Sequence, residues 1–375
     1  MKSKIALLSA LSLLIILSCS KSSDTASDTD FGVEPNDPET AANLIIESDK
    51  IICEFCDGFG AIIETYETQI FVGGLNKIWI FERNGLSISL VQEIGLSGLL
   101  ELNSITANND ELLLGLNNEF GDGSIHRYRK IGSDWEFEQI YEIGRSLDNF
   151  GNDIDLSSDY MVVGASAPWS NSINEGNLDA GSIHIFSRSG EDWNLNQDFN
   201  AQDSFADDRF GTDVLIWENI ILVGGLSIPL HAYQLENNTW SLLRIEENMV
   251  PADLARDVNT VLYYSEQFGL QSFRVNGDGS FEMLNVNPVP IEGGSIQFGG
   301  DNISMSNGYA LFRFLGGDQV YLLKLTDTTW ELETSFNPAM ETQFEYSGIK
   351  LTPDLALIAG NNRTNSTFYL FFEDY

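Results

Sequence analysis

The feature that most constrains this chain is an internal repeat whose units contain only strand-like patterns. Two stretches show it clearly, one starting at Phe150 and the other at Phe210. Each contains, in order, Phe-Gly, an alternating apolar run, a turn, a short apolar run ending in Gly, a loop, a third alternating run, a turn and Trp. Units of 40 to 50 residues with four short strands are typical of β-propellers.

A fixed spacing supports the same interpretation. In four units an apolar residue of the third run lies seven residues before a Trp: Tyr128 and Trp135, Phe186 and Trp193, Tyr233 and Trp240, Leu323 and Trp330. Turn-forming residues such as Ser189-Gly190 and Asn237-Asn238 separate the two positions, as a hairpin requires. Each unit is therefore predicted to end in a β-hairpin whose last strand begins near the Trp.

Counting the repeats gives seven units. They start at Phe59, near Asn103, at Phe150, at Phe210, near Leu254, at Phe298 and at Tyr346. The last unit has no room for an outer strand, because the sequence ends at Tyr375. We therefore expect an N-terminal strand, residues 43–47, to complete the last unit and remove two open sheet edges. The predicted fold of residues 43–375 is all-β, a seven-bladed β-propeller closed in this way.

The first 42 residues differ in composition from the rest. Residues 1–18 begin with two Lys and continue with an apolar run of 13 residues, too short to cross a bilayer comfortably, which predicts a signal peptide. Ile-Leu-Ser-Cys at residues 16–19 resembles the lipobox of bacterial lipoproteins, which implies that Cys19 is lipidated and anchors the chain to a membrane. The alternative is an ordinary signal peptide with a chance cysteine. Residues 19–42 are polar and predict a disordered tether.

The third unit carries a family resemblance. Phe150-Gly151, Val-Val-Gly-Ala-Ser-Ala-Pro at 162–168 and Ala-Gly-Ser-Ile-His-Ile-Phe at 180–186 resemble the bacterial FG-GAP repeat, a type of repeat that also builds the integrin α-subunit propeller. The resemblance implies a propeller in a cell-surface or secreted setting, but no single activity. Integrin-type repeats hold calcium in a loop between the first two strands. The corresponding turns here, 157–159 and 217–219, are too short and too poor in carboxylates, so we expect no metal and no cofactor.

Histidines and cysteines were candidates for a metal site. His126, His184 and His231 occupy one position of the third strand in three different units, so they cannot meet at one ion, and we interpret them as structural. Cys53 and Cys56 lack a second pair to complete a zinc site, and we predict a disulfide that fastens the closing strand to the first unit. A free dithiol is the alternative.

Catalytic patterns are weak in this sequence. Asp153 and Asp155, Asp207 and Asp208, and Asp253 and Asp257 form pairs, but 56 acidic residues make such pairs expected by chance, and we interpret most as solvated surface. A glycosidase would need two carboxyl groups at a fixed separation in one pocket. The repeated Trp residues are predicted to pack in the core and not to serve as sugar-stacking platforms.

Loop lengths indicate where a partner would bind. The connections between second and third strands, and from one unit to the next, share one face of a propeller, and we expect the binding residues there. The candidates are Trp169, Glu175, Asp179, Asp203, Asp207 and Asp208. A net charge of −37 excludes nucleic acid and anionic membrane surfaces as electrostatic partners.

Taken with the anchor, the sequence favours a non-enzymatic binding or adhesion module in the cell envelope, at the outer membrane on an undetermined face, for an unknown protein or glycan. One alternative is a carbohydrate-active hydrolase or lyase. Another is a structural subunit of an outer-membrane complex.

Overall fold

The computed structural model describes residues 43–47, 50–54, 56–85, 87–96, 100–118, 121–143, 148–166, 181–200, 208–251, 253–265, 268–287, 302–313, 319–337, 344–362, 367–373 and 375. Every regular element within these ranges is a β-strand. Accordingly, no helix long and apolar enough to cross a bilayer occurs in this part of the chain. The predicted signal peptide, Cys19 and the tether lie outside the described residues.

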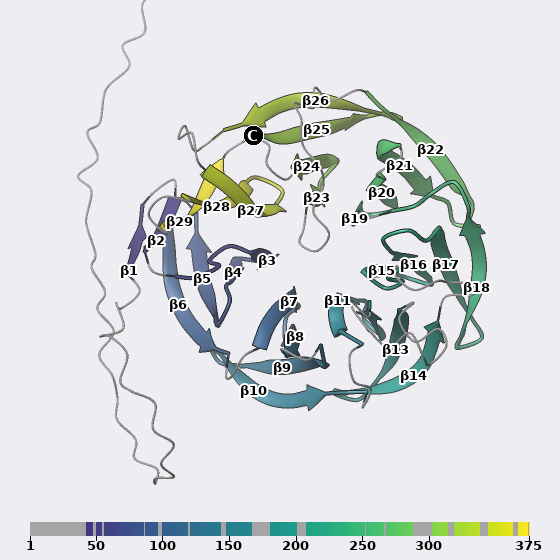
Figure 1. Cartoon of the computed structure of the whole chain (residues 1–375), viewed down its shortest axis with the longest axis horizontal. Coiled ribbons are helices and arrows are strands. Elements are labelled where there is room, and N and C mark those ends of the chain that lie inside the picture. The colour runs from purple at the N-terminus through teal and green to yellow at the C-terminus, as the bar shows by residue number, and fades with distance from the viewer. Residues whose placement is uncertain are drawn as a thin grey trace, which may run out of the picture.

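Successive strands form antiparallel sheets of four, arranged in a ring (Figure 1). The first sheet contains β3 (Ile62–Tyr66), β4 (Gln69–Gly73), β5 (Lys77–Asn84) and β6 (Ser87–Gly95). The second contains β7 (Leu100–Ala107), β8 (Glu111–Asn118), β9 (Gly123–Ile131) and β10 (Asp134–Tyr141). The third contains β11 (Phe150–Leu156), β12 (Tyr160–Ala165), β13 (Ser182–Ser189) and β14 (Asp192–Asn200). The fourth contains β15 (Asp213–Trp217), β16 (Ile220–Gly224), β17 (Leu230–Glu236) and β18 (Thr239–Glu246).

The next two groups of four strands are joined in one eight-stranded sheet. One group is β19 (Asp253–Asp257), β20 (Thr260–Ser265), β21 (Gly269–Val275) and β22 (Phe281–Val286). The other is β23 (Ile303–Ser306), β24 (Tyr309–Arg313), β25 (Val320–Thr326) and β26 (Thr329–Phe336). A short parallel pairing of β22 with β26 connects them, with Asn285 opposite Thr329 and Val286 opposite Trp330. The all-β propeller is therefore confirmed, whereas the count of seven units stays a prediction, because these two groups share one sheet.

Both ends of the fold meet in the last sheet. Its order is β1 (Asn43–Ile46), β2 (Lys50–Glu54), β29 (Thr367–Glu373), β28 (Ala356–Asn362) and β27 (Phe344–Leu351). An N-terminal segment completes this sheet, as predicted, but the strand that pairs with β29 is β2, and β1 adds a fifth strand outside it. The predicted position of the strand is wrong, because the link from β2 to Phe59 is much shorter than the connections between complete units.

The hydrophobic core lies between neighbouring sheets. One cluster joins Phe59 and Trp79 of the first sheet to Leu357 and Leu370 of the last, and the other clusters likewise combine two adjacent sheets. The repeated Trp135, Trp193, Trp240 and Trp330 are at most 3% exposed. They are core residues and cannot serve as sugar-stacking platforms.

The Phe-Gly pair has a physical role in these contacts. Phe150 packs edge-on against the His184 ring at 5.5 Å, and the corresponding phenylalanines of the first and fourth sheets contact their third strands in the same way. Gly211 has φ of +85°, and a Cβ atom on Gly164 of the preceding sheet would overlap the Gly211 carbonyl oxygen. The repeated glycines therefore allow two backbones to touch where the sheets converge.

Outer strands are held together by glutamine side chains. The Gln197 amide in β14 donates to the Trp240 carbonyl oxygen at 3.1 Å and accepts the Trp240 N–H at 2.7 Å. Gln92 in β6 makes the same two bonds to Trp135, at 2.8 Å each. Each amide replaces the backbone pairing that a further strand would supply. We call this arrangement the glutamine bracket.

A buried ion cluster lies between the second and third sheets. The Arg127 guanidinium in β9 is fully buried and pairs with the Glu111 carboxylate of β8 at 2.5 Å. Glu111 also pairs with Arg188 of β13 at 2.5 Å, and Arg188 lies over the Trp193 ring. Two cations therefore compensate one carboxylate that is only 1% exposed, and the cluster ties the two sheets together.

Candidate functional site

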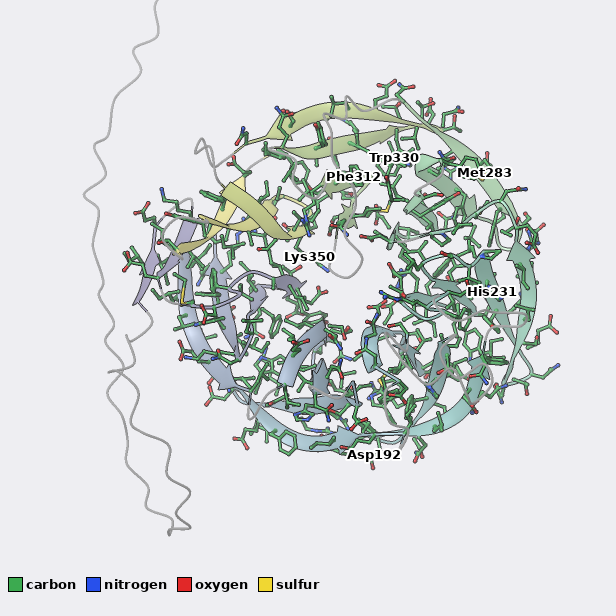
Figure 2. The ribbon with its side chains drawn as sticks, viewed as in Figure 1. Asp192, His231, Met283, Phe312, Trp330 and Lys350 are labelled. Carbon is green, nitrogen blue, oxygen red and sulfur yellow. A yellow bond between two sulfur atoms is a disulfide. The ribbon has the colours of Figure 1, made fainter. Side chains whose placement is uncertain are left out.

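A cavity of about 610 Å³ occupies the centre of the ring. It is lined by residues of the innermost strand of each group, namely β3, β7, β11, β15, β19, β23 and, in the five-stranded last sheet, β27. The Lys350 side chain of β27 lies at this inner edge, whereas Asp192 and Met283 lie at the outer rim (Figure 2). We call this cavity the central channel.

Aspartates of the channel join neighbouring strands by hydrogen bonds. Asp153 Oδ2 accepts the Val214 N–H at 2.7 Å, and Asp155 Oδ2 accepts the Ile216 N–H at 2.8 Å, so β11 is hydrogen-bonded to β15 through side chains. The alignment of β11 with β15 could not be predicted from the sequence, because it depends on how two separate repeats pack together. Most of the acidic pairs were predicted to be solvated surface, and Asp153 and Asp155 depart from that expectation because both carboxylates accept backbone N–H groups of the next sheet.

The same arrangement recurs farther round the ring. Asp213 Oδ2 accepts the Leu254 N–H at 2.6 Å. Asp253, which is 6% exposed, accepts the Asn302 N–H at 2.9 Å. Asp257, its neighbour in the predicted pair, accepts the Gly308 N–H at 2.6 Å. Asp253 and Asp257 also depart from the expectation of solvated surface, because their carboxylates join the two four-strand groups of the eight-stranded sheet.

Two cations balance part of this charge. Lys350 Nζ lies 2.7 Å from Glu64 Oε2 and links the last sheet to the first. Arg256 Nη2 lies 3.7 Å from Asp155 Oδ2 and donates to the Ile216 carbonyl oxygen at 2.9 Å. Burial raises the pKa of the Asp155 carboxyl, and the Arg256 charge acts in the opposite direction. The four side chains are 21–27% exposed and face the channel, so each ion pair contributes modestly to stability.

The lining contains no aromatic side chain among the described residues. Glycan-binding sites rely on aromatic faces that stack against sugar rings, and pockets for organic ligands are rich in aromatic and apolar groups. The described lining instead consists of aliphatic, polar and charged side chains.

Asparagines link three sheets at the end of the channel where the first strands begin. Asn103 Nδ2 donates to Asn149 Oδ1 at 2.9 Å, and Asn149 Nδ2 donates to Asn152 Oδ1 at 2.7 Å. Asn152 in turn donates to the Thr212 carbonyl oxygen at 2.7 Å. Sequence analysis missed this chain of amides. The one available signal was Asn149 directly before Phe-Gly, where φ is +55°, a value that asparagine tolerates.

Of the six predicted binding residues, one lies within the described part of the chain. Trp169, Glu175, Asp179, Asp203 and Asp207 fall outside the described residues. Asp208 is described and half-buried, and its carbonyl oxygen accepts the Leu226 N–H at 2.9 Å. That bond ties the start of the fourth sheet to the β16–β17 connection. The predicted grouping of these six side chains therefore stays a prediction.

The histidines lie in separate sheets. His184 and His231 are each 2% exposed, and His231 Nδ1 is 2.8 Å from the Pro229 carbonyl oxygen. Burial lowers the pKa of His231 and of His126. Across the described ranges, no three His, Cys, Asp or Glu side chains are placed to hold a metal ion. Each histidine therefore packs within its own sheet, His184 and His231 against the phenylalanine of Phe-Gly.

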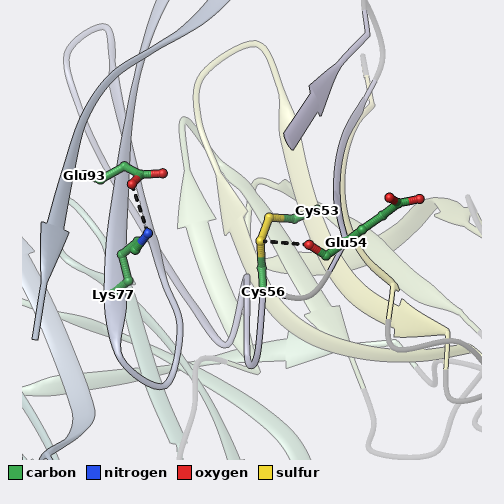
Figure 3. Close-up of a disulfide and its surroundings, with 5 residues drawn as sticks. All are labelled: Cys53, Glu54, Cys56, Lys77 and Glu93. Carbon is green, nitrogen blue, oxygen red and sulfur yellow. Dashed lines mark hydrogen bonds and ion pairs between the residues drawn. A yellow bond between two sulfur atoms is a disulfide. The ribbon is translucent and has the colours of Figure 1, made fainter. Parts of the chain in front are cut away.

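Cys53 and Cys56 are joined by a disulfide, with their Cα atoms 5.7 Å apart (Figure 3). Both side chains are at most 3% exposed. Cys53 belongs to β2, and Cys56 begins the turn into the first sheet. The bond therefore connects the segment that completes the ring to the sheet that follows it.

A family model for the FG-GAP repeat matches residues 144–186, which cover most of the third unit. No curated protein sequence matches the chain. Among solved structures, the β-propeller domain of Cps50 (Swd1) from Myceliophteria thermophila is similar, at 9% identity over 84% of this chain and 97% of that chain, with a TM-score of 0.59. A protein from Desulfotomaculum acetoxidans is similar at 12% identity over 78% and 94%, with a TM-score of 0.53. At these identities the likeness establishes the fold alone.

Proposed function

Because the chain folds as a β-propeller and carries an FG-GAP repeat, we propose that it is a lipid-anchored, non-enzymatic binding module of the cell envelope. Its partner is a protein or a glycan, held on the face that carries the β12–β13, β14–β15 and β18–β19 connections. We name this face the loop face. The proposal includes lipidation at Cys19 and an outer-membrane location.

The observation that carries the proposal is the engagement of the channel acids. Asp153, Asp155, Asp213 and Asp253 each accept a backbone N–H of the next group of strands around the ring. A general acid or nucleophile must exchange protons or form bonds during turnover, and doing so here would break a contact between sheets. This favours binding over the alternative of a carbohydrate-active hydrolase or lyase.

Loop-face binding is tested with glycan and protein arrays probed by the full-length chain in detergent. Trp169→Ala is expected to abolish or strongly weaken the signal. Val258→Ala is the matched control, because Val258 is 75% exposed in the β19–β20 turn on the opposite face. Equal loss in both variants, or in neither, would refute the loop face as the binding surface. Hydrolysis of a polysaccharide panel, abolished by Asp153→Asn in a folded protein, would favour the enzyme.

The anchor is tested separately. Metabolic labelling with a palmitate analogue should mark the wild-type chain and fail for Cys19→Ser. Stoichiometric co-purification with an outer-membrane complex would instead favour the structural-subunit alternative.

A further inference from the structure

The ring depends on a short segment at the start of the described chain. In residues 43–54, β1 pairs with β2 from Asn43 opposite Glu54 to Ile46 opposite Ile51. β2 in turn pairs with β29 from Lys50 opposite Phe371 to Glu54 opposite Thr367. Ile51 and Cys53 of β2 are fully buried in the core between the last and first sheets. We call residues 43–54 the closing segment. The closing segment precedes the first sheet in the sequence, but its backbone pairs with β29 near the end of the chain.

Beyond this segment the chain is fixed to the first sheet. The Asp57 carbonyl oxygen accepts the Leu75 N–H at 3.0 Å, and the Gly60 N–H donates to the Gly73 carbonyl oxygen at 2.9 Å. The connection from Glu54 to Asp57 therefore joins the closing segment to the rest of the fold, and we call it the joint.

The disulfide spans this joint. It holds the Cα atoms of Cys53 and Cys56 5.7 Å apart, whereas three extended residues reach about 10 Å. To leave its own β29 and reach another, the closing segment would have to extend at the joint. A covalent bond across the joint prevents that extension.

We propose that the Cys53–Cys56 disulfide determines which copy of the chain completes the last sheet. When the bond is formed, the closing segment stays on its own β29. When it is absent, the closing segment pairs with β29 of a second copy, which presents the same edge and the same core. Exchange of an identical element is a low-cost route to oligomers, and mutation of a hinge is known to promote it. The inference does not depend on the proposed binding function.

A cross-link between two full-length copies in detergent tests the proposal. Both copies carry Cys53→Ala and Cys56→Ala. One copy also carries Ile52→Cys and the other Tyr369→Cys, because Ile52 of β2 is directly opposite Tyr369 of β29. Mild oxidation is expected to give a covalent dimer. Glu373→Cys in place of Tyr369→Cys is the register control, since Glu373 is opposite Ala356 and not β2. Absence of the dimer, or equal dimer with the control, overturns the proposal.

A second measurement uses the native cysteines. Two differently tagged wild-type copies are mixed and incubated with or without dithiothreitol, with complete reduction verified by thiol titration. Co-purification of the two tags is expected to rise at least tenfold after reduction. Equal co-purification in both conditions overturns the proposal even if the alanine variants fail to fold.

Discussion

The glutamine bracket gives the sharpest test of how the sheets are held at the rim. Gln197→Leu keeps the side-chain size but removes both hydrogen bonds to the Trp240 backbone. The Trp240 N–H and carbonyl groups then lose their partners in a partly buried strand. The control is Gln139→Leu, because Gln139 lies four residues after Trp135, as Gln197 does after Trp193, but makes no such bracket in the described structure.

The expected magnitude follows from those two bonds. A hydrogen bond contributes about 0.5–1.5 kcal/mol net, and an unsatisfied buried polar group costs about 1–3 kcal/mol. Part of this cost is relieved because water reaches the rim. We therefore expect Gln197→Leu to lower the free energy of unfolding by about 2 kcal/mol, and Gln139→Leu by less than about 0.5 kcal/mol.

Urea unfolding followed by tryptophan fluorescence measures both variants. Trp240 itself reports the site, since it is 1% exposed when folded. Adding Gln92→Leu to Gln197→Leu should add a similar loss, because the two brackets join different pairs of sheets. If Gln197→Leu and Gln139→Leu have the same midpoint, the bracket does not stabilise the ring and the reasoning fails.

Three further outcomes follow from the packing. Gly164→Ala should cost about 3 kcal/mol or prevent folding, because its Cβ would overlap the backbone of the next sheet, whereas Gly95→Ala, which meets open space, should be nearly neutral in urea unfolding. Glu111→Ala should cost about 3 kcal/mol, because the buried Arg127 would lose its nearest carboxylate and keep only Glu138 at 3.3 Å and Asp192 at 3.5 Å. A loss of unfolding free energy under about 1 kcal/mol would contradict this. Burial lowers the pKa of His231 in the folded state below its ordinary value of 6.5, so the unfolded state binds a proton more readily as the pH falls. The free energy of unfolding is therefore highest above pH 6.5 and decreases as the pH falls through the folded-state pKa. In urea midpoints measured from pH 7.5 to 5, His231→Gln should lose less stability than wild type, and an identical profile would exclude this contribution.

Periodicity predicted the sheets because each unit repeats the same local pattern. The seven-residue spacing to Trp135 and its equivalents located the last hairpin of four units, and Phe150-Gly151 located the start of a sheet. These are local signals, set by residues that contact their own unit or the next one. The prediction for the closing strand was close but shifted, because nothing in the repeat encodes the short link after Cys56.

The channel could not be predicted in the same way. Asp153 and Asp213 appear as ordinary acidic residues in the sequence, and their roles depend on the register between strands some 40 to 60 residues apart. The asparagine chain through Asn149 likewise joins three sheets. Side-chain contacts between repeats depend on the angle at which the sheets meet, which no single unit determines.

The direction of β1 determines at which face of the propeller the described chain begins. Asn43 is opposite Glu54, and Glu54 leads into the turn at which the first sheet begins, on the loop face. The start of β1 therefore lies at the edge of the loop face. Under the proposed lipidation of Cys19, a partner bound to the loop face would therefore lie between the propeller and the membrane, and the opposite face would point away from the membrane.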